Sequence, residues 1–127
     1  MSSDAIPEHL RAFIRDQIHS IEQLEILLLL RRARNEQWSA ELTARELRIT
    51  TESAGDRLED LVSRGLVARS DFVGRFCYAP TTPALDQCVA ELDRVYAERR
   101  VSVITLIFTK PDPAQTFANA FRIRGPK

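Results

Sequence analysis

The sequence has few of the residues from which metal centres and redox sites are built. It contains two cysteines, Cys77 and Cys88, and two histidines, His9 and His19, among 127 residues. The cysteines form no CxxC pair and the histidines no HExxH motif, so a structural zinc site is not expected. We interpret both cysteines as small, buried, reduced side chains, and we expect no metal and no cofactor.

Signatures of catalysis and of membrane insertion are missing as well. There is no glycine-rich phosphate loop, no GxSxG motif and no cluster of His, Cys and carboxylate residues. The adjacent carboxylates Glu59 and Asp60 are expected on a solvated helix face, where no apolar pocket would shift their pKa values for acid–base catalysis. We therefore do not expect an enzyme. The longest apolar run, residues 26–30, is far too short to span a bilayer, and the N-terminus has no signal-peptide pattern. We expect a cytoplasmic protein that makes no membrane contact.

The chain also lacks an excess of charge of either sign. Its formal net charge is zero, whereas a histone-like or nucleic-acid coat protein would be clearly basic. Composition alone therefore gives no support for DNA binding. The length suits one domain with helical extensions.

The most informative segment that is present spans residues 38–79. Its pattern predicts two short helices, a tight turn between them and then a two-stranded hairpin. Ser39 and Thr50 are suitable N-caps for the two helices, and residues 48–50 leave a gap of helix-turn-helix length. Gly65 follows the second helix where a C-terminal glycine is favoured. Gly74 separates the two β-prone runs, residues 66–71 and 75–79.

Helices are predicted on both sides of this segment. An apolar stripe from Leu10 to Ile21 indicates either a separate N-terminal arm or the start of the next helix, with Ser20 and Gln23 allowing a fresh start. Residues 21–33 are apolar nearly all round, as in a central helix covered by protein. We expect one helix over residues 82–109, roughly 40 Å long, although β-branched residues at 101–108 also allow a strand. A last short helix is expected after residues 112–113.

The sequence WSAELTARELRIT followed by TESAGDRLEDLVSRGLVAR resembles the winged-helix bacterial transcription regulators of the multiple-antibiotic-resistance-regulator type. The LxxLVxRGLV pattern at residues 58–67 is the most specific part. The resemblance implies a mainly α fold with a small β-hairpin, in which a winged helix-turn-helix core carries N- and C-terminal helical extensions. It further implies a recognition helix at about residues 50–64 and a wing at about residues 71–75. Arg48 departs from the pattern, because glycine is common between the helices.

Three regions follow from this interpretation: an N-terminal helical arm at residues 1–19, the winged helix-turn-helix domain at 20–80, and a C-terminal helical dimerisation region at 81–127. Near the start of the recognition helix, Thr51, Ser53 and Arg57 are candidates for DNA contacts. On the wing, Arg69 and Arg75 are further candidates. The alternative for the helix arginines is an exposed charge or an ion pair with Asp56 or Asp60.

The long C-terminal helix carries more apolar surface than a small core can cover, so we expect a second copy of the chain to cover it. A ligand pocket between the core and these helices, near Trp38 or Tyr96, is a further possibility. The candidate dimerisation residues are Leu92, Tyr96, Val103, Leu106, Ile107, Phe117 and Phe121.

The charge of the recognition helix leaves two functions open. It holds Glu52, Asp56, Glu59 and Asp60 against two arginines, and residues 39–79 contain six cations and seven anions. A net negative charge on the surface that faces DNA weakens phosphate binding. Glu52 or Asp56 could, however, accept a hydrogen bond from the N4 amino group of cytosine. The sequence thus favours a homodimeric transcriptional regulator that binds double-stranded DNA. The alternative is a winged-helix protein–protein interaction module that does not bind DNA.

Overall fold

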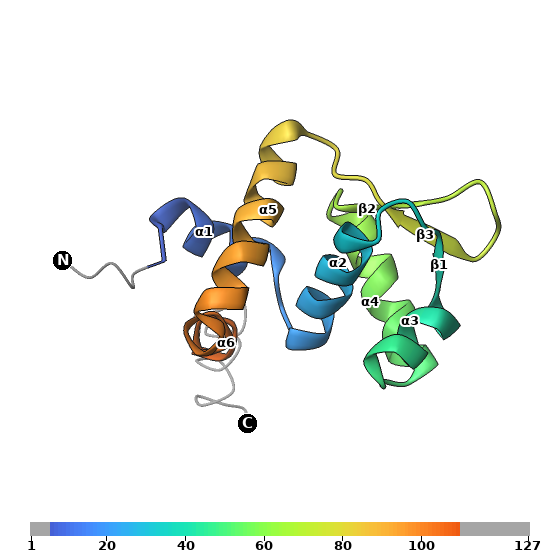
Figure 1. The fold of residues 1–127 in the computed structure, drawn as a ribbon, viewed down its shortest axis with the longest axis horizontal. Coiled ribbons are helices and arrows are strands. Elements are labelled where there is room, and N and C mark those ends of the chain that lie inside the picture. Colours follow the sequence, from blue (N-terminus) through green and yellow to red (C-terminus); the bar gives the residue numbers. More distant parts are fainter. Residues whose placement is uncertain (1–5, 110–127) are drawn as a thin grey trace, which may run out of the picture.

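The computed structural model describes residues 6–109 of the chain, which form six helices and three short strands. The elements are, in order, α1 (Glu8–Gln17), α2 (Ile21–Arg32), β1 (Trp38–Ser39), α3 (Ala40–Leu47), α4 (Thr51–Ser63), β2 (Val67–Arg69), β3 (Arg75–Tyr78), α5 (Pro83–Glu98) and α6 (Arg100–Thr109). Helices α1, α5 and α6 gather on one side, and α3, α4 and the sheet on the other, with α2 between them (Figure 1). The predicted fold class, a winged helix-turn-helix with helical extensions at both ends, is confirmed.

The sheet has one strand more than the sequence predicted. Its order is β1-β3-β2, and both pairings are antiparallel, with Trp38 opposite Phe76 and Val67 opposite Tyr78. Strand β1 has only two residues, which is too short for the alternation that identifies a strand in sequence. Phe76 and Tyr78 lie two residues apart on β3 and therefore share one face of the strand, and both side chains are buried.

Helix α2 is the central helix that its apolar sequence predicted. Its leucines and Ile26 are buried against α3, α4 and strand β3, apart from the half-buried Leu29. The helix begins anew at Ser20, whose hydroxyl accepts a hydrogen bond from the Gln23 amide at 3.0 Å. The preceding segment is therefore the separate helix α1, which has Pro7 at its N-cap.

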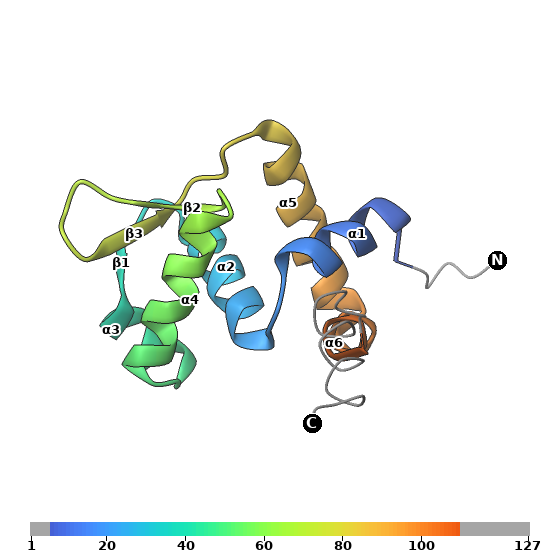
Figure 2. The same cartoon turned by 180° about the vertical axis from the view of Figure 1, so that it is seen from behind.

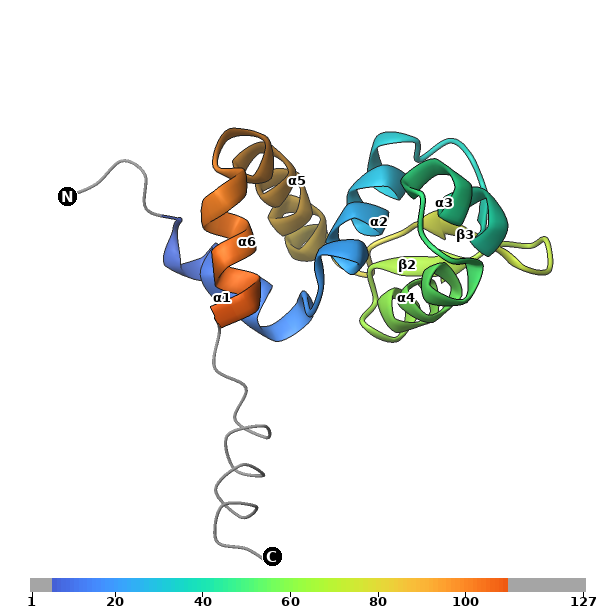
Figure 3. The ribbon, with the colours of Figure 1, turned by 90° about the horizontal axis from the view of Figure 1, so that it is seen from below.

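The prediction of one continuous helix over residues 82–109 is wrong. At Arg99 the backbone leaves the helical region (φ −134°, ψ 54°), and α6 turns back to pack against α1 and α5 (Figures 2 and 3). This turn buries Val103 and Ile107, which a straight helix would leave in water. Neither glycine nor proline marks the break, so no local signal predicts it. Residues 101–108 are helical rather than extended, and the predicted last helix lies outside the described residues.

Candidate nucleic-acid interface

Two capped helices and a tight turn form the helix-turn-helix. The Ser39 hydroxyl accepts from the Leu42 amide and the Thr50 hydroxyl from the Ser53 amide, each at 3.0 Å. Between the helices, Arg48 adopts a left-handed conformation (φ 60°, ψ 47°), and the Ile49 amide donates to the Ala44 carbonyl at 3.0 Å. This geometry is the one that favours glycine after a helix, which explains why glycine is expected at Arg48. The turn places the N-terminus of α4 at the surface, where Thr51 is exposed.

Two of the predicted DNA contacts on α4 are bound to the protein itself. Ser53 donates a hydrogen bond from its hydroxyl to a Glu22 carboxylate oxygen, and the Arg57 Nε lies 3.4 Å from the same oxygen. Glu22 belongs to α2, so the pairing differs from the neighbouring Asp56 or Asp60 that the sequence offered. Both side chains of the ion pair are about 40% exposed, which leaves Arg57 accessible to a second anion.

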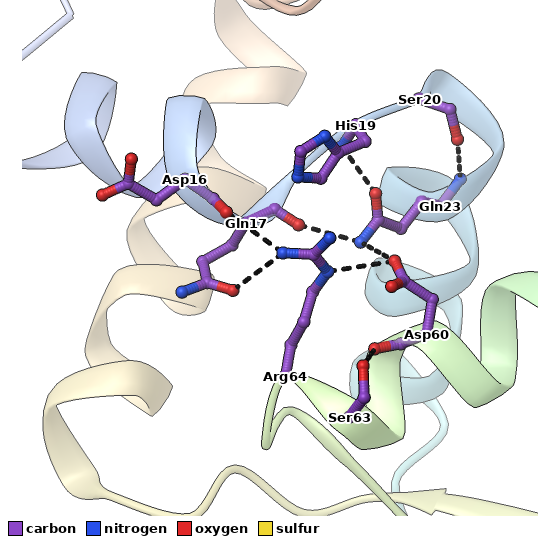
Figure 4. A network of polar contacts seen from close by, with 8 residues as sticks. All are labelled: Asp16, Gln17, His19, Ser20, Gln23, Asp60, Ser63 and Arg64. Atoms are coloured by element: carbon purple, nitrogen blue, oxygen red, sulfur yellow. Dashed lines mark hydrogen bonds and ion pairs between the residues drawn. The ribbon is translucent and has the colours of Figure 1, made fainter. Parts of the chain in front are cut away.

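A polar network joins the end of α4 to the α1–α2 connection (Figure 4). Arg64 donates from Nε to Asp60 at 3.0 Å and from a terminal nitrogen to the Asp16 carbonyl at 3.0 Å. Gln23, whose side chain is buried, donates to the same Asp60 oxygen at 3.0 Å and to the Gln17 carbonyl at 2.8 Å. Arg64 and Asp60 therefore hold the helix in place, and neither adds its full charge to the outer face of α4.

The outer face of α4 carries acidic residues. Glu52, Asp56 and Glu59 are exposed and follow one another at steps of three and four residues, which places them on one side of the helix. Glu59 is bonded by Arg69 of strand β2, while Glu52 and Asp56 face solvent. The structure thus strengthens the concern raised by the sequence, because Arg57 and Arg64 pair with Glu22 and Asp60, whereas Glu52 and Asp56 face solvent.

The wing carries its cations differently. Arg69 is exposed and pairs with Glu59 of α4, and Arg75 is exposed with one weak hydrogen bond to the Gln37 carbonyl at 3.4 Å. The loop between β2 and β3 projects from the half of the molecule that contains α3 and α4, away from α1 and α6 (Figure 1). Both predicted wing arginines therefore lie at the surface of a protruding hairpin.

The sequence analysis missed two residues at the tip of this hairpin. Phe72 is 65% exposed and Val73 is fully exposed. The signal was present, because a hairpin loop ordinarily carries polar residues and this one reads Ser-Asp-Phe-Val-Gly. Together with the arginines, these side chains give the wing a mixed cationic and apolar surface.

The terminal helices place the predicted dimerisation residues in two environments. Leu92, Tyr96, Val103 and Ile107 are buried within the chain, where they join α5 and α6 to the core. Leu106 is half-buried, and Phe117 and Phe121 lie outside the described residues. The large exposed apolar side chains of α6 are instead Val101 (75% exposed) and Phe108 (73% exposed).

A hollow of about 520 Å³ lies between α2, the end of α3 and the α5–α6 junction. Tyr96 borders it and donates a hydrogen bond to Glu25 at 2.8 Å. Burial and this hydrogen bond raise the pKa of Tyr96 to about 12. Arg32 also borders it and bonds Asp93 of α5 at 2.6 Å, which raises the pKa of the guanidinium above its ordinary value. This hollow lies where the sequence analysis placed a possible ligand pocket near Tyr96.

Within residues 6–109, no group of three or more His, Cys, Asp and Glu side chains is placed to hold a metal ion. In the same part of the chain, no helix is both long enough and apolar enough to cross a membrane.

Comparison with known proteins adds one structural likeness. The chain is similar to the crystal structure of the adhesin competence repressor from Streptococcus pyogenes, at a TM-score of 0.49 and 16% sequence identity, over 90% of this chain and 89% of that one. No protein-family model matches the sequence, and no curated protein is similar to it. A likeness at this TM-score carries no argument about function, and the assignment of the fold rests on the order, pairing and packing of the elements themselves.

Proposed function

We propose that this protein is a DNA-binding transcriptional regulator that acts as a homodimer. The observation that carries the proposal is the arrangement of one half of the molecule, in which a capped helix α4 with an exposed N-terminus stands beside a protruding wing. In this arrangement a helix enters the major groove while the hairpin reaches the neighbouring backbone or minor groove. Thr51, Arg57, Arg69 and Arg75 are the side chains best placed to contact DNA.

The exposed apolar residues of α6 support the proposed homodimer. Val101 and Phe108 are exposed on this helix, and Ile104 and Leu106 between them are half-buried. A second copy of α6 would remove this surface from water and give the dimer one recognition helix and one wing for each of two half-sites. The buried candidates Leu92, Tyr96, Val103 and Ile107 would then support the interface from beneath.

Sedimentation velocity of the full chain tests the dimer. We expect Phe108→Glu to yield monomers, because a carboxylate would be buried without a partner. Val73→Glu on the wing is the matched control, since it places the same charge on another exposed apolar position, and it should leave the dimer intact. A Phe108→Glu protein that remains a dimer would place the interface elsewhere.

Selection from a random duplex library, followed by fluorescence anisotropy on the selected sites, tests DNA binding. A regulator is expected to enrich a two-fold symmetric site and to bind it at least about a thousandfold more tightly than random duplex. Enrichment of no sequence, with no binding to any duplex at low salt, would contradict the proposal.

One observation favours the alternative function, a module that binds another protein. The outer face of α4 presents Glu52, Asp56 and Glu59, while Arg57 and Arg64 are engaged by Glu22 and Asp60. Such a surface would suit a basic protein partner better than phosphate. Absence of DNA binding, with the dimer intact, would select this alternative.

A further inference from the structure

The tip of the wing has a fixed shape. The Ser70 amide donates to the Arg75 carbonyl at 2.9 Å, and the Arg75 amide donates back to the Phe72 carbonyl at 3.1 Å. The Phe72 amide donates to the Ser70 hydroxyl oxygen at 3.1 Å, and Gly74 takes the positive φ (+79°) that closes the turn. Each of these bonds lies within the hairpin, so the tip is ordered before any partner arrives.

The two apolar side chains on this tip contribute little to the fold. Phe72 is 65% exposed, Val73 is fully exposed, and a Cβ added at the adjacent Gly74 would meet no atom within 4 Å. An exposed aromatic residue beside an exposed valine on a rigid projection is the kind of apolar surface that marks an interaction site.

We propose that Phe72 and Val73 form a wedge that enters the minor groove of duplex DNA, partly unstacks one base step and bends the duplex. This inference rests on the proposed DNA binding and identifies what the wing contributes to it. Proteins that enter the minor groove use apolar wedges of this kind, and phenylalanine is among the residues inserted.

The surroundings of the tip suit a DNA backbone. Exposed Arg69 and Arg75 flank the wedge on the two strands, and Asp71 is the only acid between them. A hollow of about 490 Å³ beside the tip is lined by Gln37, Phe72, Val73 and Arg75. It offers an apolar wall to a sugar and a guanidinium to the adjoining phosphate, which favours a nucleic acid over a purely apolar partner.

A wedge would also compensate for the weak phosphate binding expected from the acidic face of α4. Phosphate neutralisation supplies a salt-dependent share of affinity, and the exposed Glu52 and Asp56 reduce that share. Apolar contact with an unstacked base step does not depend on salt concentration. The wedge would therefore sustain binding where the charge of the recognition helix does not.

The test compares the full-length wild type with the double variant Phe72→Ala, Val73→Ser on end-labelled duplexes that carry central TA steps, which unstack easily. Fluorescence anisotropy across salt concentrations gives affinity, and energy transfer between the duplex ends gives bending. The control is Ala84→Ser, a change at an exposed apolar position of α5 that belongs neither to the wing nor to α6.

We expect the wild type to bend the duplex by roughly 20–90°. The double variant should bind about tenfold more weakly, without bending and with an unchanged salt slope. Ala84→Ser should behave as the wild type does. Equal affinity and equal bending in the double variant would overturn the wedge and leave the proposed DNA binding intact. A wild type that binds no duplex would overturn both, and this outcome is recognised without any variant.

Discussion

The recognition helix and the wing hold their charged residues in different ways. On α4, Arg57 and Arg64 are engaged by Glu22 and Asp60, and the face turned to solvent is acidic. On the wing, Arg75 has only a 3.4 Å hydrogen bond to a backbone carbonyl, and Phe72 and Val73 have little contact with the rest of the chain. The difference teaches that the arginines of α4 mainly anchor the helix, whereas Arg75, Phe72 and Val73 of the wing remain available for a partner. Arg69, on strand β2, pairs with Glu59 of α4.

The largest expected effect concerns the anchoring of α4. Gln23→Ala removes hydrogen bonds to Asp60, to the Gln17 carbonyl and to the His19 amide in a buried site. We expect the free energy of unfolding, measured in urea, to fall by about 2–3 kcal/mol. Phe72→Ala is the comparison on the wing and should change stability by less than about 0.5 kcal/mol. An equal loss of unfolding free energy in the two variants would contradict the distinction between residues that anchor α4 and residues that are free on the wing.

The second prediction concerns the arginines in DNA binding. Arg75→Ala should weaken binding to random duplex about tenfold and lower the salt slope by about one, because an accessible phosphate contact is lost. Arg57→Ala should weaken binding by no more than about threefold, since its charge is already shared with Glu22. Anisotropy at several salt concentrations measures both. A larger effect for Arg57 would mean that α4 makes the main phosphate contacts.

The third prediction concerns the turn that positions α4. Arg48 occupies a left-handed conformation at φ 60°, which is costly for a residue with a side chain. Arg48→Gly should raise the free energy of unfolding by about 0.5–1 kcal/mol, after allowance for the extra freedom of glycine in the unfolded chain. Urea denaturation measures the change. A destabilised variant would show that the arginine side chain contributes more than its backbone conformation costs.

The smallest expected effect concerns the acidic face. Glu52→Gln removes one exposed anion next to the N-terminus of α4 and should tighten binding to random duplex about threefold at low salt. Glu36→Gln, at an exposed position before β1, is the control for a general change in net charge. If Glu52→Gln weakens binding to a selected site instead, the carboxylate is reading a base edge.

The winged helix-turn-helix was predictable because its signals are local. Ser39, Thr50 and Gly65 occupy the caps and the C-terminal position that the sequence indicated, and Ala54, Leu58 and Leu61, spaced as on one helix face, are buried. The turn at Arg99 was not predictable, because it depends on the packing of α6 against α1 and α5 rather than on a local breaker. The position of the break between α5 and α6 is thus set by tertiary packing, not by the local helix propensity of the sequence.

The candidate site was predictable in composition but not in contacts. Arg69 and Arg75 were assigned to the wing surface from the hairpin pattern, and they lie there. The engagement of Ser53 and Arg57 by Glu22 joins residues more than thirty positions apart, and no spacing rule links them. The sequence contains the apolar residues Phe72 and Val73 in the predicted hairpin loop, but only the fold shows that both are exposed.

The most direct test of this account is amide hydrogen exchange of the full-length protein with and without duplex DNA. If the wing is the main contact, the strongest new protection should fall on residues 69–76, with weaker protection at the N-terminus of α4. Protection confined to the acidic face of α4 or to α6, with none on the wing, would contradict the central claim that the wing makes the main contact with DNA.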